Sequence, residues 1–232
     1  TVTRALNVSF VNCRQFNDIQ DRTRWGIMGS NFSKNLVYDR CELSRFDAHQ
    51  GVANATIRDS ILGHAGINAI GNGTFVVENT TVYGRNFINL RPDYGSTWRG
   101  EFVIRNCRFV PASGRPLNAS LIGGSNDGQH DFGYTCHMPE RISINGLHID
   151  DSNHPKGYQG PTIFANFNPS FTNASYVEKY PYVKAREVVL HNVSTASGKP
   201  LRTSNNPFMF KDVVVKHQGT PDKPRKSIRP TS

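Results

Sequence analysis

The 232-residue sequence has few apolar residues and no long apolar run. Hydrophobic residues make up 37% of the chain, with only 3 Met and 2 Trp. No stretch of about 18 consecutive apolar residues occurs, so no membrane-spanning helix is expected. The sequence also lacks a Cys-x-x-Cys pair and any Cys/His spacing typical of a zinc site. It indicates no cofactor and no metal site.

Acidic residues are scarce relative to basic ones, and the formal net charge is +9. Part of the excess lies in residues 217–232, which are rich in Lys, Arg and Pro and are expected to form an extended tail after a domain over residues 1–216. A basic balance favours an anionic polymer as partner. Because no nucleic-acid-binding motif accompanies the charge, an acidic polysaccharide is favoured over nucleic acid.

What the chain does contain is a repeat of seven rows. The rows align on one reference column: Cys13, Cys41, Ser60, Thr80, Cys107, Leu147 and Val193. Five residues before it stand Val8, Leu36, Ala55, Phe75, Phe102, Ile142 and Val188. Three residues before it stand Phe10, Tyr38, Ile57, Val77, Ile104, Ile144 and Leu190. An apolar-x-apolar spacing predicts one strand in each row.

A bend is predicted directly before each reference position. The residues there are Asn12, Arg40, Asp59, Asn79, Asn106, Gly146 and Asn192, mostly of the types that tolerate sharp turns. A strand, a bend and a further strand, repeated along the chain, indicate a β-solenoid of about seven to eight coils. Such coils expose one face of each strand, which explains the low apolar fraction.

The rows are 28, 19, 20, 27, 40 and 46 residues apart, so their lengths are uneven. The two longest rows predict loop insertions at residues 110–140 and 154–182. Loops of this length are usually functional or face a partner. The first insertion carries His130, Asp131, Tyr134 and His137, for which closing over a groove, binding a metal and simple solvation all remain open.

Three of the four cysteines fall on the inward reference column, which favours buried thiols over disulfides. Coils lie about 4.8 Å apart, so a Cys13–Cys41 bond is the alternative. Eight Asn-x-Ser/Thr sequons occur. Glycosylation is expected as one alternative at Asn7, Asn31, Asn54, Asn72, Asn118 and Asn173. Asn79 and Asn192 lie on the bend column, so chance explains those two sequons better.

A candidate site emerges from a second strand in the middle coils. Ala48, Ile67 and Phe87 each lie seven residues past the reference position and are predicted to point inward. Alternation then places Asp47, Gly66 and Asn86 outward, and also His49, Asn68 and Ile88. His64 and Arg85 occupy nearly matching turns, and the next turn supplies Arg91, Asp93, Tyr94 and Trp98.

Polysaccharide chemistry would use these residue types in definite roles. His49 or His64 would be a general base, Asp47 an acid or orienting group, and Arg85 or Arg91 a clamp on a uronate carboxylate. Substrate contacts are expected from Asn68, Asn86, Asp93, Tyr94 and Trp98. The alternative is structural: a solvated Asp47 and His49, an Arg91–Asp93 ion pair, and Trp98 packed on Phe102.

The aligned rows, the Asn-Cys bends and the inward columns over residues 5–215 resemble the right-handed parallel β-helix superfamily typified by pectate lyases. The resemblance implies the fold and a link to carbohydrate, but no single activity. The segment from Gly63 to Gly66 is similar to the Gly-His-Gly segment of polygalacturonases. The paired aspartates of those enzymes, the pectinesterase signatures and the calcium cluster of pectate lyases are absent.

The sequence therefore predicts an extracellular, cell-surface or virion-surface β-helix that binds an acidic polysaccharide. Cleavage by a lyase or glycoside hydrolase mechanism is one outcome. A non-catalytic adhesin, tailspike or fibre module is the other. Calcium would be the cofactor of a pectate-lyase-like enzyme, but no calcium site is recognisable. The open first coil is expected to meet a larger parent chain or a second copy.

Overall fold

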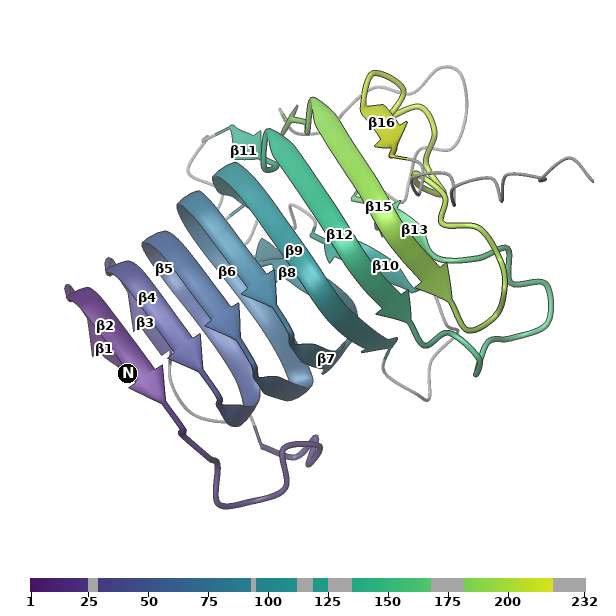
Figure 1. The fold of residues 1–232 in the computed structure, drawn as a ribbon. Coiled ribbons are helices and arrows are strands. Elements are labelled where there is room, and N and C mark those ends of the chain that lie inside the picture. Colours follow the sequence, from purple (N-terminus) through teal and green to yellow (C-terminus); the bar gives the residue numbers. More distant parts are fainter. Residues whose placement is uncertain (25–28, 93–94, 112–118, 125–134, 168–181, 219–232) are drawn as a thin grey trace, which may run out of the picture.

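The chain forms a stack of β-coils in this computed structural model (Figure 1), which describes residues 1–24, 29–92, 95–111, 119–124, 135–167 and 182–218. The strands are β1 (Val2–Thr3), β2 (Leu6–Val11), β3 (Gly29–Asn31), β4 (Lys34–Asp39), β5 (Glu42–Arg58), β6 (Ile61–Glu78), β7 (Thr81–Gly84), β8 (Asn86–Leu90), β9 (Trp98–Pro111), β10 (Ser120–Gly123), β11 (Cys136–His137), β12 (Arg141–Ile149), β13 (Thr162–Phe164), β14 (Tyr182–Val183), β15 (Glu187–Thr195) and β16 (Val214–His217). Each described strand pair is parallel.

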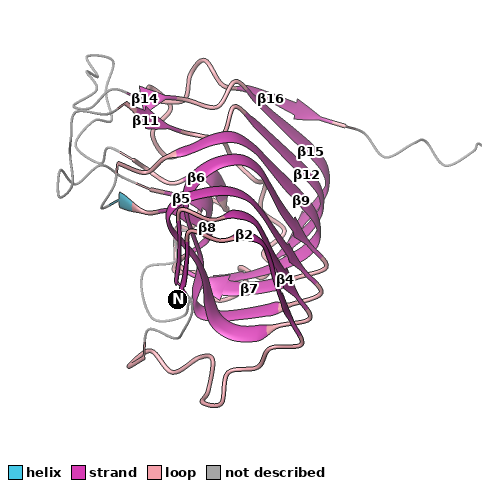
Figure 2. Ribbon diagram, turned by 90° about the vertical axis from the view of Figure 1, so that its left-hand side faces the viewer, coloured by secondary structure: helices cyan, strands magenta, loops and turns pink. Residues whose placement is uncertain are grey.

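The longest strands curve around corners, so that each coil has three sides (Figure 2). The long face comprises β2, β4, residues 53–58, 74–78 and 101–105, the first half of β12, β15 and β16. The corner face comprises residues 42–43, 61–62, β7, 108–111, 147–149 and 193–195. The groove face comprises β1, β3, residues 45–48 and 66–69, β8, β10 and β13.

The pairing register of the long face confirms the predicted repeat residue by residue. Val8, Leu36, Ala55, Phe75, Phe102, Ile142 and Val188 are Cα partners in successive rows, and Val215 adds one further row. Identical columns therefore stack in register along the axis. The chain is an all-β parallel β-helix, as its sequence pattern predicts.

The predicted bend column is also confirmed by the backbone. All seven residues have positive φ, from 47° at Asn79 to 83° at Gly146. Asn and Gly accept this left-handed conformation at low cost, whereas Arg40 adopts it at a φ of 52° under the constraint of its neighbours. Each bend turns the chain from the long face to the corner face without interrupting the stacking.

A second bend column precedes the long face, and the repeat analysis does not identify it. Asn7, Asn35, Asn54, Gly73 and Gly100 all have positive φ there. Asn35 Nδ2 donates to Asn7 Oδ1 at 2.8 Å, and Asn54 Nδ2 donates to Asn35 Oδ1 at 3.0 Å. The Nδ2 atom of Asn54, where a glycan would be attached, is thus engaged within the coil stack.

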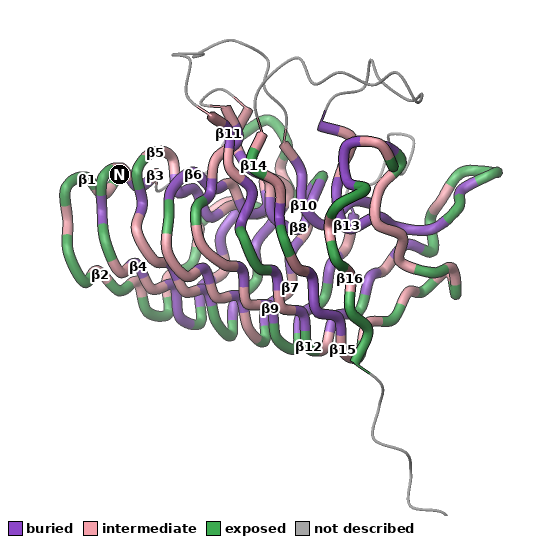
Figure 3. The backbone as a smooth tube through the Cα atoms, turned by 90° about the horizontal axis from the view of Figure 1, so that it is seen from above, coloured by how far each residue is buried: buried purple, intermediate pink, exposed green. Residues whose placement is uncertain are grey.

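Buried residues recur along the coils of the stack (Figure 3), and their apolar side chains form one core between the three faces. Rings meet edge to face from coil to coil: Phe10–Tyr38 at 5.1 Å, Tyr38–Phe46 at 4.8 Å and Phe46–Phe75 at 5.3 Å between centroids. The middle of the reference column is buried, and none of the four cysteines forms a disulfide. The expectation of unbridged thiols on this column is confirmed. Cys41 and Cys107 are buried as expected, whereas Cys13 in the first coil is only partly buried.

The predicted inward ladder of the second strand is partly wrong. The register pairs Phe46 with Ile67, Ile67 with Ile88, and Ile88 with Ile122. Ala48 belongs to the next inward column, and Phe87 lies at the preceding corner, packed against Phe109 at 5.9 Å. The corner between the two faces varies in length from coil to coil, so a constant offset from the reference column fails.

The long rows contain more than loops. β10 lies within residues 110–140 and β13 within residues 154–182. Both strands continue the groove face, since β10 pairs with β8 and β13 pairs with β10. β11 and β14 form a separate two-stranded sheet. His130, Asp131 and Tyr134 lie outside the described residues, as does nearly all of the tail after β16. Over the described residues, no helix is long and apolar enough to cross a membrane.

Candidate functional site

A groove of about 880 Å³ lies on the outer side of the groove face. It is lined by Arg22, Thr23, Arg24, His64, Ala65, Ile67, Asn68, Arg85, Asn86, Asn89, Pro92, Ser120, Gly124, Ala165, Asn166 and Asn205. Five of these residues are asparagines, three are arginines, and no carboxylate is present among the described lining residues. The groove therefore presents amide and cationic groups to a ligand.

The floor of the groove is a column of outward-facing residues, one from each of three successive coils. Asp47, Asn68 and Asn89 are register partners in this column. Asn89 Nδ2 donates to Asn68 Oδ1 at 3.1 Å, and Asn68 Nδ2 donates to the Ala65 carbonyl at 2.9 Å. These bonds fix the orientation of the Asn68 amide. Stacked coils thus hold polar groups at intervals of about 4.8 Å along the groove.

Asn86 is placed deeper, with 8% of its surface exposed. Its Nδ2 donates to the Ser120 carbonyl at 3.1 Å. A Cβ on Gly123 would lie 2.0 Å from Asn86 Oδ1, so the absence of a side chain at Gly123 makes room for the Asn86 amide. The sequence prediction that Asn68 and Asn86 lie at one site agrees with their place in the groove.

One wall of the groove is the segment of residues 18–24, which follows the first coil. Two Asx turns shape it: Gln20 N donates to Asp18 Oδ1, and Thr23 N donates to Asp21 Oδ1, each at 2.9 Å. The hydrogen bonds from Thr23 hold the pKa of the Asp21 carboxyl below its usual value. Arg24 forms an ion pair with Asp21 at 3.4 Å. The wall is therefore a structured segment that brings cations to the groove.

The Ile19 carbonyl docks the wall on the coil stack. Ile19 O accepts from the backbone N of His64 at 3.1 Å and from His64 Nδ1 at 3.1 Å. A Cβ on Gly63 would lie 1.9 Å from the same oxygen, so this approach requires glycine. Because Nδ1 carries the donated hydrogen, Nε2 is the basic nitrogen of His64.

Arg85 is exposed and lies at the groove corner of the coil next to His64. Adjacent coils bring backbone positions to within about 4.8 Å, so a sugar unit can touch both residues. The predicted pairing of His64 with Arg85 is consistent with this geometry.

Asp47 does not lie exposed on the strand, as the alternation predicts, but is 0% exposed. Arg45 Nη1 lies 3.0 Å from Asp47 Oδ2, and Arg91 Nη1 lies 3.2 Å from Asp47 Oδ1. Arg45 and Arg91 supply the countercharges that the buried carboxylate of Asp47 needs. Asp47 is thus an anchor for Arg91 at the end of the groove, next to Pro92, and not an acid open to substrate.

His49 belongs to the same cluster, with its side chain 37% exposed. Arg91 Nη1 lies 2.9 Å from His49 Nδ1, closer than Asp47 Oδ2 at 3.4 Å. Since a guanidinium has only donors, Nδ1 accepts and Nε2 carries the hydrogen. His49 Nδ1 is therefore engaged by Arg91, whereas His64 lines the groove, so His64 is the better placed of the two predicted bases.

Trp98 is not available for stacking on a sugar. It is 0% exposed, its ring lies 5.1 Å from Phe75 and 5.9 Å from Phe102, and Nε1 donates to the Gly73 carbonyl at 3.0 Å. The alternative of a packing role is the correct one. Asp93 and Tyr94 lie outside the described residues.

Several residues of the groove were not predicted from the sequence. The first row is 28 residues long against 19 for the next, so the extra length that builds the wall with Arg22 and Arg24 was a visible signal. At the other end, buried Asn206 donates from Nδ2 to Asn166 Oδ1 at 3.1 Å and accepts from Met209 N at 3.1 Å. Nothing in the repeat marks these asparagines, because they lie beyond its regular rows.

Metal binding has no support within the described ranges, where no group of three or more His, Cys, Asp or Glu is arranged to hold an ion. His137 is described, and burial lowers the pKa of its imidazole. Its neighbours on the predicted loop lie outside the described residues.

Comparison with known proteins gives one relevant relative. A capsule KL64-specific depolymerase of Klebsiella phage P510 is 32% identical over an alignment of 130 residues, which covers 44% of this chain and 13% of the phage protein. The chain therefore matches a small part of that protein's length. No protein-family profile matches the chain, and no solved structure matches it.

Proposed function

We propose that this β-helix binds an acidic polysaccharide in the groove and cleaves it by β-elimination. The observation that carries the proposal is the lining of the groove, where arginines and amides converge without a described carboxylate. Such a lining attracts an anionic sugar and offers bidentate contacts to its carboxylate. The likeness to a phage capsule depolymerase supports a polysaccharide as the ligand and a virion surface as the setting.

The chemistry that these residues support is proton abstraction next to a uronate carboxylate. Arg85 would bind that carboxylate and stabilise the negative charge that develops on it. His64 Nε2 would take the proton from C5, the C4–O bond would break, and the departing oxygen would take up a proton. A C4=C5 double bond results, so the atoms and electrons balance without a cofactor.

Hydrolysis fits the described groove less well. Glycoside hydrolases of either stereochemistry generally need two carboxylates that flank the scissile bond. Asp47 is covered by two arginines, and Asp21 in the wall is paired with Arg24. A binding module without activity is the second candidate, favoured by the His64 Nδ1 bond to Ile19, which also serves to dock the wall.

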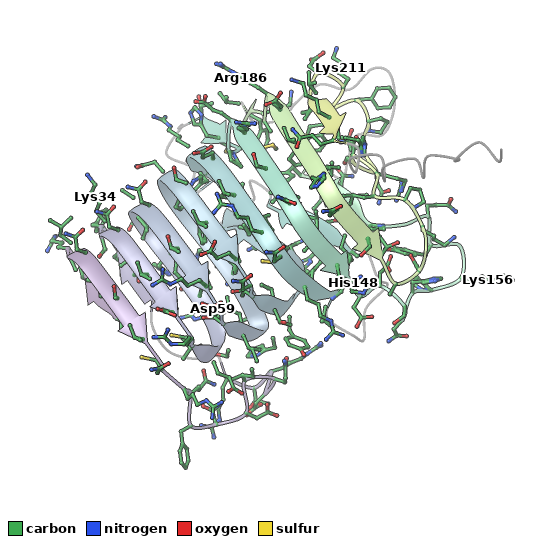
Figure 4. The ribbon with its side chains drawn as sticks, in the orientation of Figure 1. Lys34, Asp59, His148, Lys156, Arg186 and Lys211 are labelled. Atoms are coloured by element: carbon green, nitrogen blue, oxygen red, sulfur yellow. The ribbon has the colours of Figure 1, made fainter. Side chains whose placement is uncertain are left out.

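The test is incubation of the chain with a panel of capsule polysaccharides, including that of the KL64 type, followed by ultraviolet absorbance of the unsaturated uronate. We expect absorbance to rise with at least one uronate-containing polymer. His64→Gln should lower kcat by about 10²-fold or more, the usual contribution of a general base. His148→Gln is the matched control, since His148 is exposed on β12 (Figure 4).

Each outcome has a defined meaning. If the chain binds the polymer but produces neither new absorbance nor shorter products, the lyase proposal is refuted and the binding module stands. Shorter products without new absorbance would show hydrolysis and remove His64 as the base. Absence of binding to every acidic polymer in the panel would refute the proposed function.

A further inference from the structure

A second, smaller hollow of about 250 Å³ lies beside the groove, at the end of the stack nearest to β13. It is formed largely by residues 155–160, together with Ala119, Thr162, Arg202 and Asn205. Residues 155–160 belong to the predicted insertion of residues 154–182, which was expected to be functional or to face a partner. Its size suits a single sugar unit, compared with the several units that the main groove can hold.

The two hollows adjoin. Asn205 lines both of them. Ser120, which lines the groove, and Thr162, which lines the hollow, are linked by a hydroxyl–hydroxyl hydrogen bond of 2.7 Å. Both hydroxyl residues are buried, at 4% and 3% exposed. The groove and the hollow therefore meet at Asn205.

The outer wall of the hollow is held by a buried carboxylate. Asp151, which is 0% exposed, accepts from Tyr158 Oη at 2.9 Å, from Ser197 Oγ at 2.6 Å and from Ser197 N at 2.8 Å. His154 stacks on Tyr158 with ring centroids 4.8 Å apart. With three donors on one carboxylate, the segment from Asp151 to Tyr158 is a built wall and not a loosely packed loop.

The charge of the hollow is positive. Lys156 and Arg202 line it, and no carboxylate is found among its described lining residues. Arg202 Nη2 donates to the Gly160 carbonyl at 3.1 Å, while its Nε is buried with no hydrogen-bond partner among the described residues. A buried donor left unsatisfied is costly, and a carboxylate would satisfy it with a charge-assisted bond.

We propose that this hollow is a second subsite, which binds a carboxylate-bearing sugar of the same polymer that occupies the groove. The inference rests on the proposed function of the groove. Arg202 Nε donates to the sugar carboxylate, Lys156 adds charge at the exposed rim, and Asn205 contacts the linkage between the two subsites.

The test is an NMR titration of the ¹⁵N-labelled full chain with sodium D-glucuronate, with D-glucose as the neutral probe. The Arg202 Nε–H resonance, assigned with Arg202→Lys, reports on the hollow. The side-chain amides of Asn68 and Asn89 report on the groove. We expect a saturable shift of Arg202 Nε–H with glucuronate and none with glucose.

Lys156→Gln should weaken the glucuronate affinity at Arg202 by about threefold to tenfold, as expected for loss of one partly exposed charge contact. Lys211→Gln removes the same charge at another exposed position (Figure 4) and should leave the affinity unchanged.

A response at Asn68 and Asn89 without one at Arg202 would overturn the second subsite and leave the groove intact. A response at Arg202 alone would overturn the groove as the main site and with it the shared polymer. Silence at both sites would overturn both proposals.

Discussion

Asp47 shows how one residue can keep a place in the site while its role changes. It lies on an outward column, as predicted, but its register neighbours there are Asn68 and Asn89 and not the predicted Gly66 and Asn86. Its carboxylate, however, is enclosed by Arg45, Arg91 and His49. It orients the cations at the end of the groove instead of meeting the substrate.

Asp47→Asn should destabilise the protein by about 3 kcal/mol, because two largely buried arginines would lose their countercharge. Urea unfolding measures the effect. Asp59→Asn is the control, since Asp59 is exposed at a bend that Asn tolerates equally well, and it should change stability by less than about 0.5 kcal/mol. Equal stability of the two variants would contradict the burial of charge at Asp47.

Cys107 gives a prediction that depends on pH. Burial raises the pKa of its thiol to about 11, from a reference of 9.0. The unfolded chain ionises first as pH rises, so the stability contribution is complete below pH 9 and is lost as pH rises through 11. At pH 10, between these two values, iodoacetamide should label partly exposed Cys13 in the native protein and leave Cys107 unlabelled until urea is added. Mass spectrometry of the two peptides decides; equal native labelling would contradict the expectation.

Among the elements, the wall of residues 18–24 has the largest influence on the site. It carries Arg22 and Arg24 into the groove and is held by Ile19 O against His64 and Gly63. The coil stack beneath it is stabilised independently by strand pairing on three faces. The wall can therefore be displaced without unfolding the β-helix.

Gly63→Ala should displace the wall, because the new Cβ would lie 1.9 Å from Ile19 O. We expect trypsin to cut faster at Arg22 and Arg24, and acidic polymer to bind about tenfold or more weakly. Gly29→Ala is the control on the same face, since its Cβ would have ordinary contacts at 3.5 Å or more. Unchanged cleavage and binding in Gly63→Ala would show that the wall does not depend on this approach.

At the scale of the whole molecule, the chain has a net charge of +9, and its groove has no carboxylate among the described lining residues. Binding of an acidic polymer should therefore weaken by tenfold or more when NaCl rises from about 0.05 to 0.5 M, because added salt shortens the Debye length several-fold. Fluorescence anisotropy of a labelled acidic capsule polysaccharide measures it, and neutral dextran is the control. Salt-independent binding would point to recognition through uncharged groups.

The long face was predictable to the residue, whereas the groove face was not. Inward residues of the long face lie at fixed offsets from the reference column, because each bend before that column has the same length, from Asn12 to Asn192. The corner before the groove face varies, so Phe46, Ile67 and Ile88 stand at three different offsets. Of the predicted site, Asn68, Asn86, His64 and Arg85 line one groove, while Trp98 packs in the core.

The sequence by itself determined the β-helix, its bends and the inward position of three of its four cysteines, because each rests on local pattern and on repetition from row to row. Only the tertiary structure decided which polar residues meet. The wall reaches His64 across 45 residues of sequence, Arg91 reaches Asp47 across 44, and Asn205 joins two hollows. Such contacts depend on the lengths of irregular corners, which no repeat encodes, and on burial, which turns Asp47 from a surface acid into an anchor.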